Sequence, residues 1–230
     1  MRRLFLRLFS ALAVTLAAVA PAAASSGDFN QVASPAPGGN QDAFVIFYSG
    51  NGGWAAIDKA VGGRLAQAGL PVVGVDSLRY FMTRRKPEDA AADLAAAIDR
   101  YSSAFGRRKV VLAGYSFGAE ALPLIVEHLP ETERAKVEML ALISVGDQGE
   151  LAFHPKSWLN LYSADAQPLR PALAALKGLP TLCLHGGKEA ESGCVHMADL
   201  VSETVVIPGG HHYDGHYDQI AQAIATRIPR

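Results

Sequence analysis

The sequence predicts an α/β fold built on one doubly wound, mostly parallel sheet of about six strands. Short apolar runs typical of buried strands alternate along the chain with longer stretches of helical periodicity, which is the pattern of parallel strands joined by crossover helices. The run 109–119 is one such unit, because its apolar residues pass through Gly-x-Ser-x-Gly directly into helical spacing. The chain has 230 residues, of which 50% are hydrophobic and 19% charged, and this composition suits one globular domain with a sizeable core.

The first 24 residues have the composition of a secretory signal peptide. Arg2, Arg3 and Arg7 form a basic start, an apolar stretch follows over 8–20, and small residues then surround the expected cleavage site. The apolar stretch is short for a membrane span. We therefore expect residues 1–24 to be removed on export; an uncleaved anchor is the alternative.

The rest of the chain is predicted to form a flexible tether and a single domain. Residues 25–42 are rich in Ser, Pro, Gly, Asn and Gln, which is typical of a tether, and the domain then covers 43–230. Strands are predicted at 43–48, 71–76, 109–113, 137–145, 180–185 and 203–207. Helices are predicted at 54–68, 87–105, 119–129, 171–176 and 215–228. The segment 146–179 carries mixed signals, and we expect it to form a small lid or wall over the mouth of a site.

Ser116 is the candidate nucleophile. It stands at the centre of Gly114-Tyr115-Ser116-Phe117-Gly118, between a predicted strand and a predicted helix, which is the context of a nucleophile elbow. A turn this sharp crowds the strand against the helix, so the flanking positions need residues without a Cβ. The alternative is an ordinary strand–turn–helix crossover in which the glycines only make the turn.

A glycine-rich loop after the first predicted strand is the candidate for half of an oxyanion hole. Residues 49–54 read Ser-Gly-Asn-Gly-Gly-Trp, and such a loop can direct backbone N–H groups toward a developing negative charge. We assign this role to the backbone of Asn51, with Gly52 as the second choice. A phosphate loop is disfavoured because the stretch lacks the Lys-Ser/Thr pair that such loops carry.

A base and an acid follow Ser116 in the order found in hydrolases with a Gly-x-Ser-x-Gly elbow. The acid is expected after the strand at 180–185, where Glu189 is the first choice and Glu191 the alternative; Asp165 is a further candidate that no strand end precedes. The base is expected after the last strand, where His211 directly follows a Pro-Gly-Gly turn and His212 is the alternative.

Composition and spacing argue against other classes of function. The formal net charge is −1 and no basic run is dense, so a nucleic-acid partner is not expected. No cofactor motif is present, and the histidine separations match neither an HExxH helix nor a Cys/His finger, so we expect neither cofactor nor metal. The histidines considered are His185, His196, His211, His212 and His216.

The chain has two cysteines, Cys183 and Cys194. Exported proteins meet an environment in which disulfides form and persist. We therefore expect the two residues to be bridged, the alternative being two free buried thiols.

Four stretches of the chain resemble the VirJ/AcvB family, a group of exported α/β-hydrolase-like proteins of Gram-negative bacteria. These stretches read YSGNGGW at 48–54, GVDSLRYF at 74–81, GYSFGAE at 114–120 and GGHHY at 209–213. The resemblance extends over about 44–224. It implies an α/β-hydrolase type of sheet with a small lid or insertion, and a periplasmic location.

The resemblance also implies an activity and roles for individual residues. AcvB members resemble hydrolases that release lysine from lysyl-phosphatidylglycerol, so the implied substrate is an aminoacylated phospholipid at the membrane surface. VirJ members are linked to type IV secretion and virulence, so secretion components are implied partners. Ser116 is then the nucleophile, the backbone N–H groups of Asn51 and Phe117 hold the oxyanion, and Asp76 or Glu120 binds the cationic amino acid. A non-catalytic secretion factor and a general esterase or lipase are the alternatives.

Overall fold

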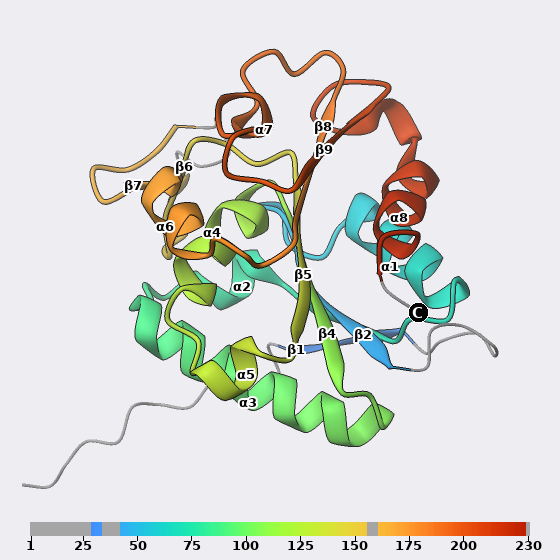
Figure 1. Ribbon diagram of the computed structural model, residues 1–230. Helices are drawn as coiled ribbons and strands as arrows, with labels where there is room; N and C mark the ends of the chain where they lie inside the picture. Colours follow the sequence, from blue (N-terminus) through green and yellow to red (C-terminus); the bar gives the residue numbers. More distant parts are fainter. Residues whose placement is uncertain (1–28, 34–41, 156–160, 229–230) are drawn as a thin grey trace, which may run out of the picture.

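The computed structural model of the protein describes residues 29–33, 42–155 and 161–228 (Figure 1). The predicted signal peptide over 1–24 lies outside these residues. A seven-stranded sheet runs through the molecule in the order β1-β3-β2-β4-β5-β8-β9. The strands are β1 (Phe29–Ala33), β2 (Ala43–Tyr48), β3 (Val72–Val75), β4 (Lys109–Tyr115), β5 (Val137–Ile143), β8 (Thr181–Gly186) and β9 (Glu203–Ile207).

Helices cover both faces of the sheet, as Figure 1 shows. One face is covered by α1 and α8, and the other by α3, α4 and α6; each face has its own cluster of buried apolar residues. The helices are α1 (Ala56–Gln67), α2 (Ser77–Tyr80), α3 (Pro87–Phe105), α4 (Phe117–Val126), α5 (Glu131–Arg134), α6 (Leu169–Ala175), α7 (Gly193–His196) and α8 (Tyr217–Ala225), with a 3₁₀ turn at Tyr213–Gly215. None of the helices within the described ranges is long and apolar enough to cross a membrane.

In the seven-stranded sheet, β2, β3, β4, β5, β8 and β9 run parallel to one another, and β1 is antiparallel to β3. The prediction of a doubly wound, mostly parallel sheet with about six strands is thereby confirmed. From β2 the chain passes to β3 on one side and then to β4 on the other, so the order reverses between β2 and β4. In open α/β sheets, sites form where loops diverge at such a reversal, beyond the carboxyl ends of the strands.

The predicted tether over 25–42 is wrong for Phe29–Ala33, which add to the sheet as β1, antiparallel to β3. Phe29 explains why this segment is held. Its side chain is buried, its ring packs edge-on against Tyr48 and Tyr80, and its carbonyl accepts a hydrogen bond from the Tyr101 hydroxyl. Burial of one aromatic ring contributes roughly 2 kcal/mol, and this helps to offset the cost of ordering a short polar strand.

The segment between β5 and β8, predicted as a lid or wall, contains a short hairpin and α6. The hairpin strands are β6 (Gln148–Gly149) and β7 (Gln167–Pro168), and they pair antiparallel. The segment is attached to the body of the domain by backbone hydrogen bonds from Phe153 to Phe81 and from Arg85 to Leu151. Leu161 and Tyr162 of this segment stand at the carboxyl ends of the strands, where they border the cavity described below.

Candidate active site

Ser116 occupies the sharp turn between β4 and α4. Its backbone has φ 51° and ψ −118°, a conformation that non-glycine residues adopt only at a cost of about 1–3 kcal/mol. The turn brings α4 so close to β2 that a Cβ on Gly118 would lie 2.4 Å from the Tyr48 carbonyl oxygen. The Ser116 N–H donates to the Ile143 carbonyl at 2.8 Å, so the neighbouring strand β5 holds the strained turn in place.

His211 stands over the serine. Its Nε2 lies 2.9 Å from Ser116 Oγ, and its Nδ1 lies 2.7 Å from Glu189 Oε1. These are the distances at which an imidazole can take the serine proton while a carboxylate holds the ring and stabilises its positive charge. The structure therefore brings Ser116, His211 and Glu189 into one hydrogen-bonded chain, although 95 residues separate the serine from the histidine.

The alternative residues considered for the base and the acid lie elsewhere. His212 Nδ1 is 2.7 Å from the Tyr115 hydroxyl. The Glu191 side chain is 94% exposed and approaches His196 at 3.8 Å. Asp165 forms an exposed ion pair with Arg84 at 2.6 Å. Of the two candidate acids, Glu189 rather than Glu191 contacts His211, and of the two candidate bases, His211 rather than His212 contacts Ser116. The spacing in the sequence left both choices open.

The Glu189 carboxylate is held in its charged form by several donors. Burial raises its pKa, but His211 and the Gly186 N–H at 2.6 Å, together with the Ser144 hydroxyl at 2.8 Å, outweigh burial and leave the pKa below its ordinary value. An ionised carboxylate at this position keeps the imidazole oriented with Nε2 toward the serine.

Ser144 is a member of the site that the sequence analysis missed. It follows β5 with φ 52°, and its Oγ lies 2.8 Å from both Glu189 Oε2 and the Tyr213 hydroxyl. The Tyr213 hydroxyl donates in turn to the Leu184 carbonyl at 3.0 Å. In the sequence, a serine directly after a strand looks like any other loop residue. The left-handed backbone conformation that distinguishes Ser144 is visible only in the structure.

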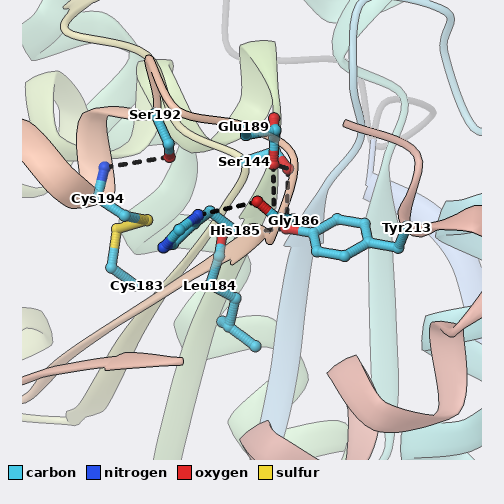
Figure 2. The surroundings of a disulfide bond; sticks show 9 residues. All are labelled: Ser144, Cys183, Leu184, His185, Gly186, Glu189, Ser192, Cys194 and Tyr213. Atoms are coloured by element: carbon cyan, nitrogen blue, oxygen red, sulfur yellow. Dashed lines mark hydrogen bonds between the residues drawn. A yellow bond between two sulfur atoms is a disulfide. The ribbon is translucent and has the colours of Figure 1, made fainter. Parts of the chain in front are cut away.

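The predicted disulfide between Cys183 and Cys194 is confirmed, with Cα atoms 5.5 Å apart. Figure 2 shows the bridge beside the end of β8, next to the turn at Gly186 that leads to Glu189. The bridge joins β8 to α7 and therefore spans the loop that carries the acid. The Ser192 hydroxyl, which accepts from the Cys194 N–H at 3.3 Å, caps α7 at the far end of the same loop.

The two groups predicted to hold an oxyanion border the same cavity as Ser116. Gly50 and Gly53 close a tight turn through a 3.1 Å hydrogen bond, which places Asn51 beside the serine. Phe117 is the first residue of α4, and the first N–H groups of an α-helix have no acceptor within the helix. Both backbones can therefore contribute to an anion site next to Ser116.

The cavity in front of Ser116 has a volume of about 560 Å³ and a wall rich in carboxylates. Glu120, one turn beyond the serine on α4, accepts a hydrogen bond from the Tyr162 hydroxyl at 2.9 Å. Burial raises the pKa of Glu120 to about 7. Glu150 and Glu191 add to the wall, and Lys188, its one lysine among the described residues, pairs with Asp214 at 2.9 Å.

Asp76, the other residue predicted to bind a cation, is not brought into this cavity. Its Oδ1 accepts the Arg79 N–H at 3.1 Å and caps α2. The same carboxylate fills the space behind the glycine-rich loop, because a Cβ on Gly53 would lie 2.9 Å from Oδ1. A carboxylate at a strand end can cap the next helix as readily as it can face a site, and here capping prevails.

Comparisons with known proteins agree with this geometry. Residues 42–230 match the model of a family described as bacterial virulence protein (VirJ). A search of curated proteins found no match. Among solved structures, Est1E from Butyrivibrio proteoclasticus superposes with a TM-score of 0.60 at 16% identity, over 85% of this chain and 90% of that one. Dienelactone hydrolase from Anabaena variabilis gives 0.59 at 21% identity, over 85% and 88%. The sheet and its helices thus have the α/β-hydrolase fold.

Proposed function

The chain belongs to the VirJ family of bacterial virulence proteins, and from that premise we propose that it is an exported serine esterase that removes the aminoacyl group from aminoacyl-phosphatidylglycerol. The observation that carries the esterase part is the chain of contacts from Ser116 Oγ to His211 at 2.9 Å and from His211 to Glu189 at 2.7 Å. A structural crossover has no need of an imidazole aligned between a strained serine and a carboxylate.

The reaction proceeds in two balanced steps. His211 Nε2 takes the Ser116 proton as Oγ attacks the acyl carbon, and the carbonyl oxygen becomes an oxyanion that accepts hydrogen bonds from the Asn51 and Phe117 N–H groups. The bond to the alcohol oxygen then breaks, and His211 gives its proton to that oxygen. Water attacks the acyl-serine in the same manner, so that the carboxylic acid leaves and the serine proton is restored.

The charge of the cavity supports an acyl group that carries an ammonium. Glu120, Glu150 and Glu191 contribute three carboxylates to the wall in addition to Glu189, which is engaged with His211. A lysyl or alanyl ester presents a cationic amino group near its carbonyl, whereas a fatty acyl chain presents none. Glu120 is the nearest of these groups along the chain, because it lies one helical turn after Ser116 on α4.

Export to the periplasm forms part of the proposal. The basic and apolar start of the sequence supports it, and so does the Cys183–Cys194 bridge, because disulfides persist mainly in oxidising compartments. Type IV secretion components are proposed as partners on the resemblance alone.

The experiment that tests the proposed activity uses the purified mature protein. A fluorophosphonate probe should label the wild type and leave Ser116→Ala unlabelled. Incubation with lysyl-, alanyl- and unmodified phosphatidylglycerol should release free amino acid from the first two lipids. An unlabelled wild type would overturn the esterase proposal, and faster turnover of p-nitrophenyl esters than of aminoacyl lipids would favour a general esterase. A Ser116→Ala variant that keeps the biological role would favour a non-catalytic secretion factor.

A further inference from the structure

A second cavity also borders Ser116. Its volume is about 310 Å³, and it shares Asn51, Ser116 and His211 with the first cavity. The two cavities therefore meet at the nucleophile, the base and one of the proposed oxyanion donors. The remaining walls of the second cavity are formed by Gly50, Gly52, Gly53, Ala55, Ala56, Ile57, Asp58, Tyr115, His212 and Tyr217.

An ester that is attacked at Ser116 needs two spaces rather than one. The tetrahedral carbon carries the serine oxygen, the oxyanion, the acyl chain and the alcohol oxygen, so the acyl and alcohol halves of the substrate diverge from it. The alcohol oxygen must also lie within reach of His211 Nε2, which supplies its proton. Both cavities border His211, so the position of His211 alone does not decide which half of the ester each one receives.

The charges of the two walls differ and decide the assignment. The first cavity carries Glu120 and the other carboxylates described above, which suit a cationic acyl group. Among the described residues of the second wall, the one carboxyl group is that of Asp58, which is 1% exposed and accepts the Ala55 N–H at 3.0 Å. Because this carboxyl group is almost fully buried and hydrogen-bonded to the backbone, it is barely accessible to a ligand in the second cavity, whereas the Glu191 side chain of the first wall is 94% exposed.

The second wall offers a hydroxyl and an imidazole instead. The Tyr115 hydroxyl lies 2.7 Å from His212 Nδ1 and 3.2 Å from the His211 carbonyl oxygen. A hydroxyl and an imidazole can exchange hydrogen bonds with an alcohol that carries further hydroxyl groups. They contribute no carboxylate that would attract an ammonium.

We infer that the second cavity binds the alcohol half of the ester and that it is suited to a small hydroxylated alcohol of the glycerol type. This inference rests on the proposed function, because it assumes that the first cavity receives the acyl group. Free glycerol and the headgroup of a phospholipid share this chemistry, and the experiment below includes both.

Gly52 provides a direct way to fill the cavity. It is exposed, and a Cβ added to it would meet no atom within 4 Å. Its φ is not in the left-handed region, unlike that of Gly53 at 73°, so a larger residue can adopt the same backbone. A leucine at position 52, on the border of the cavity, should therefore reduce the space there without displacing the turn.

The experiment compares kcat/KM for three lysyl esters, namely the methyl ester, the 1-glyceryl ester and lysyl-phosphatidylglycerol in mixed micelles. In Gly52→Leu we expect the preference for either glycerol-containing ester over the methyl ester to fall at least tenfold, chiefly through KM. Ala56→Leu, which adds bulk to the exposed start of α1, should act in the same direction. Gly63→Leu is the matched control, because Gly63 on α1 also has open space around it but does not border the cavity.

The outcomes separate this inference from the proposed function. A fall with both glycerol-containing esters supports binding of the hydroxylated alcohol itself, and a fall with the lipid alone supports binding of the headgroup. An unchanged preference in both Gly52→Leu and Ala56→Leu overturns the assignment of the cavity while leaving the esterase intact. A changed preference between lysyl and acetyl esters of one alcohol also overturns it, because the cavity would then hold the acyl group. A wild type that hydrolyses none of the three esters overturns the proposed function together with this inference.

Discussion

Replacing Glu120 by glutamine tests whether the carboxylate wall recognises a cationic acyl group. Glutamine keeps the size of the side chain and an oxygen that can accept the Tyr162 hydroxyl, now at 2.9 Å, so the change removes the charge and little else. A hydrogen bond to a charged group contributes about 1.5–3 kcal/mol. We therefore expect kcat/KM for a lysyl ester to fall roughly 10- to 150-fold.

The pH dependence of the same variant supplies a second measurement. The pKa of Glu120 is raised to about 7 by burial, and only its ionised form attracts an ammonium. The preference of the wild type for a lysyl over an acetyl ester of the same alcohol should therefore rise with pH through about 7. Taking the ratio of the two esters cancels any effect of pH on the catalytic steps that both substrates share. In Glu120→Gln the ratio should be low and independent of pH.

Glu191→Gln is the control for this experiment. Glu191 borders the same cavity, but its side chain is 94% exposed, so water screens its charge. We expect a change in the lysyl-to-acetyl ratio of no more than about threefold, in line with the small energies of exposed charges. Equal ratios in the wild type and in Glu120→Gln at pH 8 would refute the reasoning, and so would a wild-type ratio that does not change between pH 6 and 8.

Three further predictions concern the support of the site. Ser144→Ala removes a donor to Glu189, so the carboxylate is held less firmly against His211 and we expect kcat to fall roughly tenfold or more with little change in KM; an unchanged kcat would contradict this role. Asp58 has a pKa near 7 in place of its ordinary 3.8, so its ionisation should lower the free energy of unfolding in urea by roughly 3 kcal/mol between pH 4 and 7, and the stability of Asp58→Asn relative to the wild type should rise by that amount over the same range; a difference between the two proteins that does not change with pH would count against it. The Cys183–Cys194 bridge joins residues with a sequence separation of 11, and its reduction should lower the free energy of unfolding by about 3 kcal/mol. If a reductant did not change the urea midpoint, the loop would be held by other contacts.

The sequence allowed the strands and the serine turn to be predicted because local chemistry determines both. The buried apolar runs stand between helical patterns, and Gly118 is required where the turn meets β2. The features that could not be predicted from the sequence depend on contacts between segments that lie far apart along the chain. Phe29–Ala33 read as a polar tether because the partner that pairs with them, β3, lies about 40 residues further along the chain. Asp76 read as a cation ligand because its position at a strand end does not reveal which way its carboxylate turns.

The choice between His211 and His212 shows why this site required the structure. Two strands, β8 and β5, lie between β9 and β4 in the sheet, so the chain after β9 must cross the ends of both to reach the serine. It passes so close to β8 that a Cβ on Gly186 would lie 2.3 Å from the Gly210 carbonyl oxygen.

The ends of the next two strands then support the histidine itself. The Ser144 hydroxyl after β5 donates to Glu189, whose carboxylate contacts the His211 ring, and the Tyr115 hydroxyl at the end of β4 lies 3.2 Å from the His211 carbonyl oxygen. Polar groups on successive strands thus hold one particular histidine above Ser116. His211 lies over the nucleophile because of the order of the strands, and no spacing along the chain reports that order.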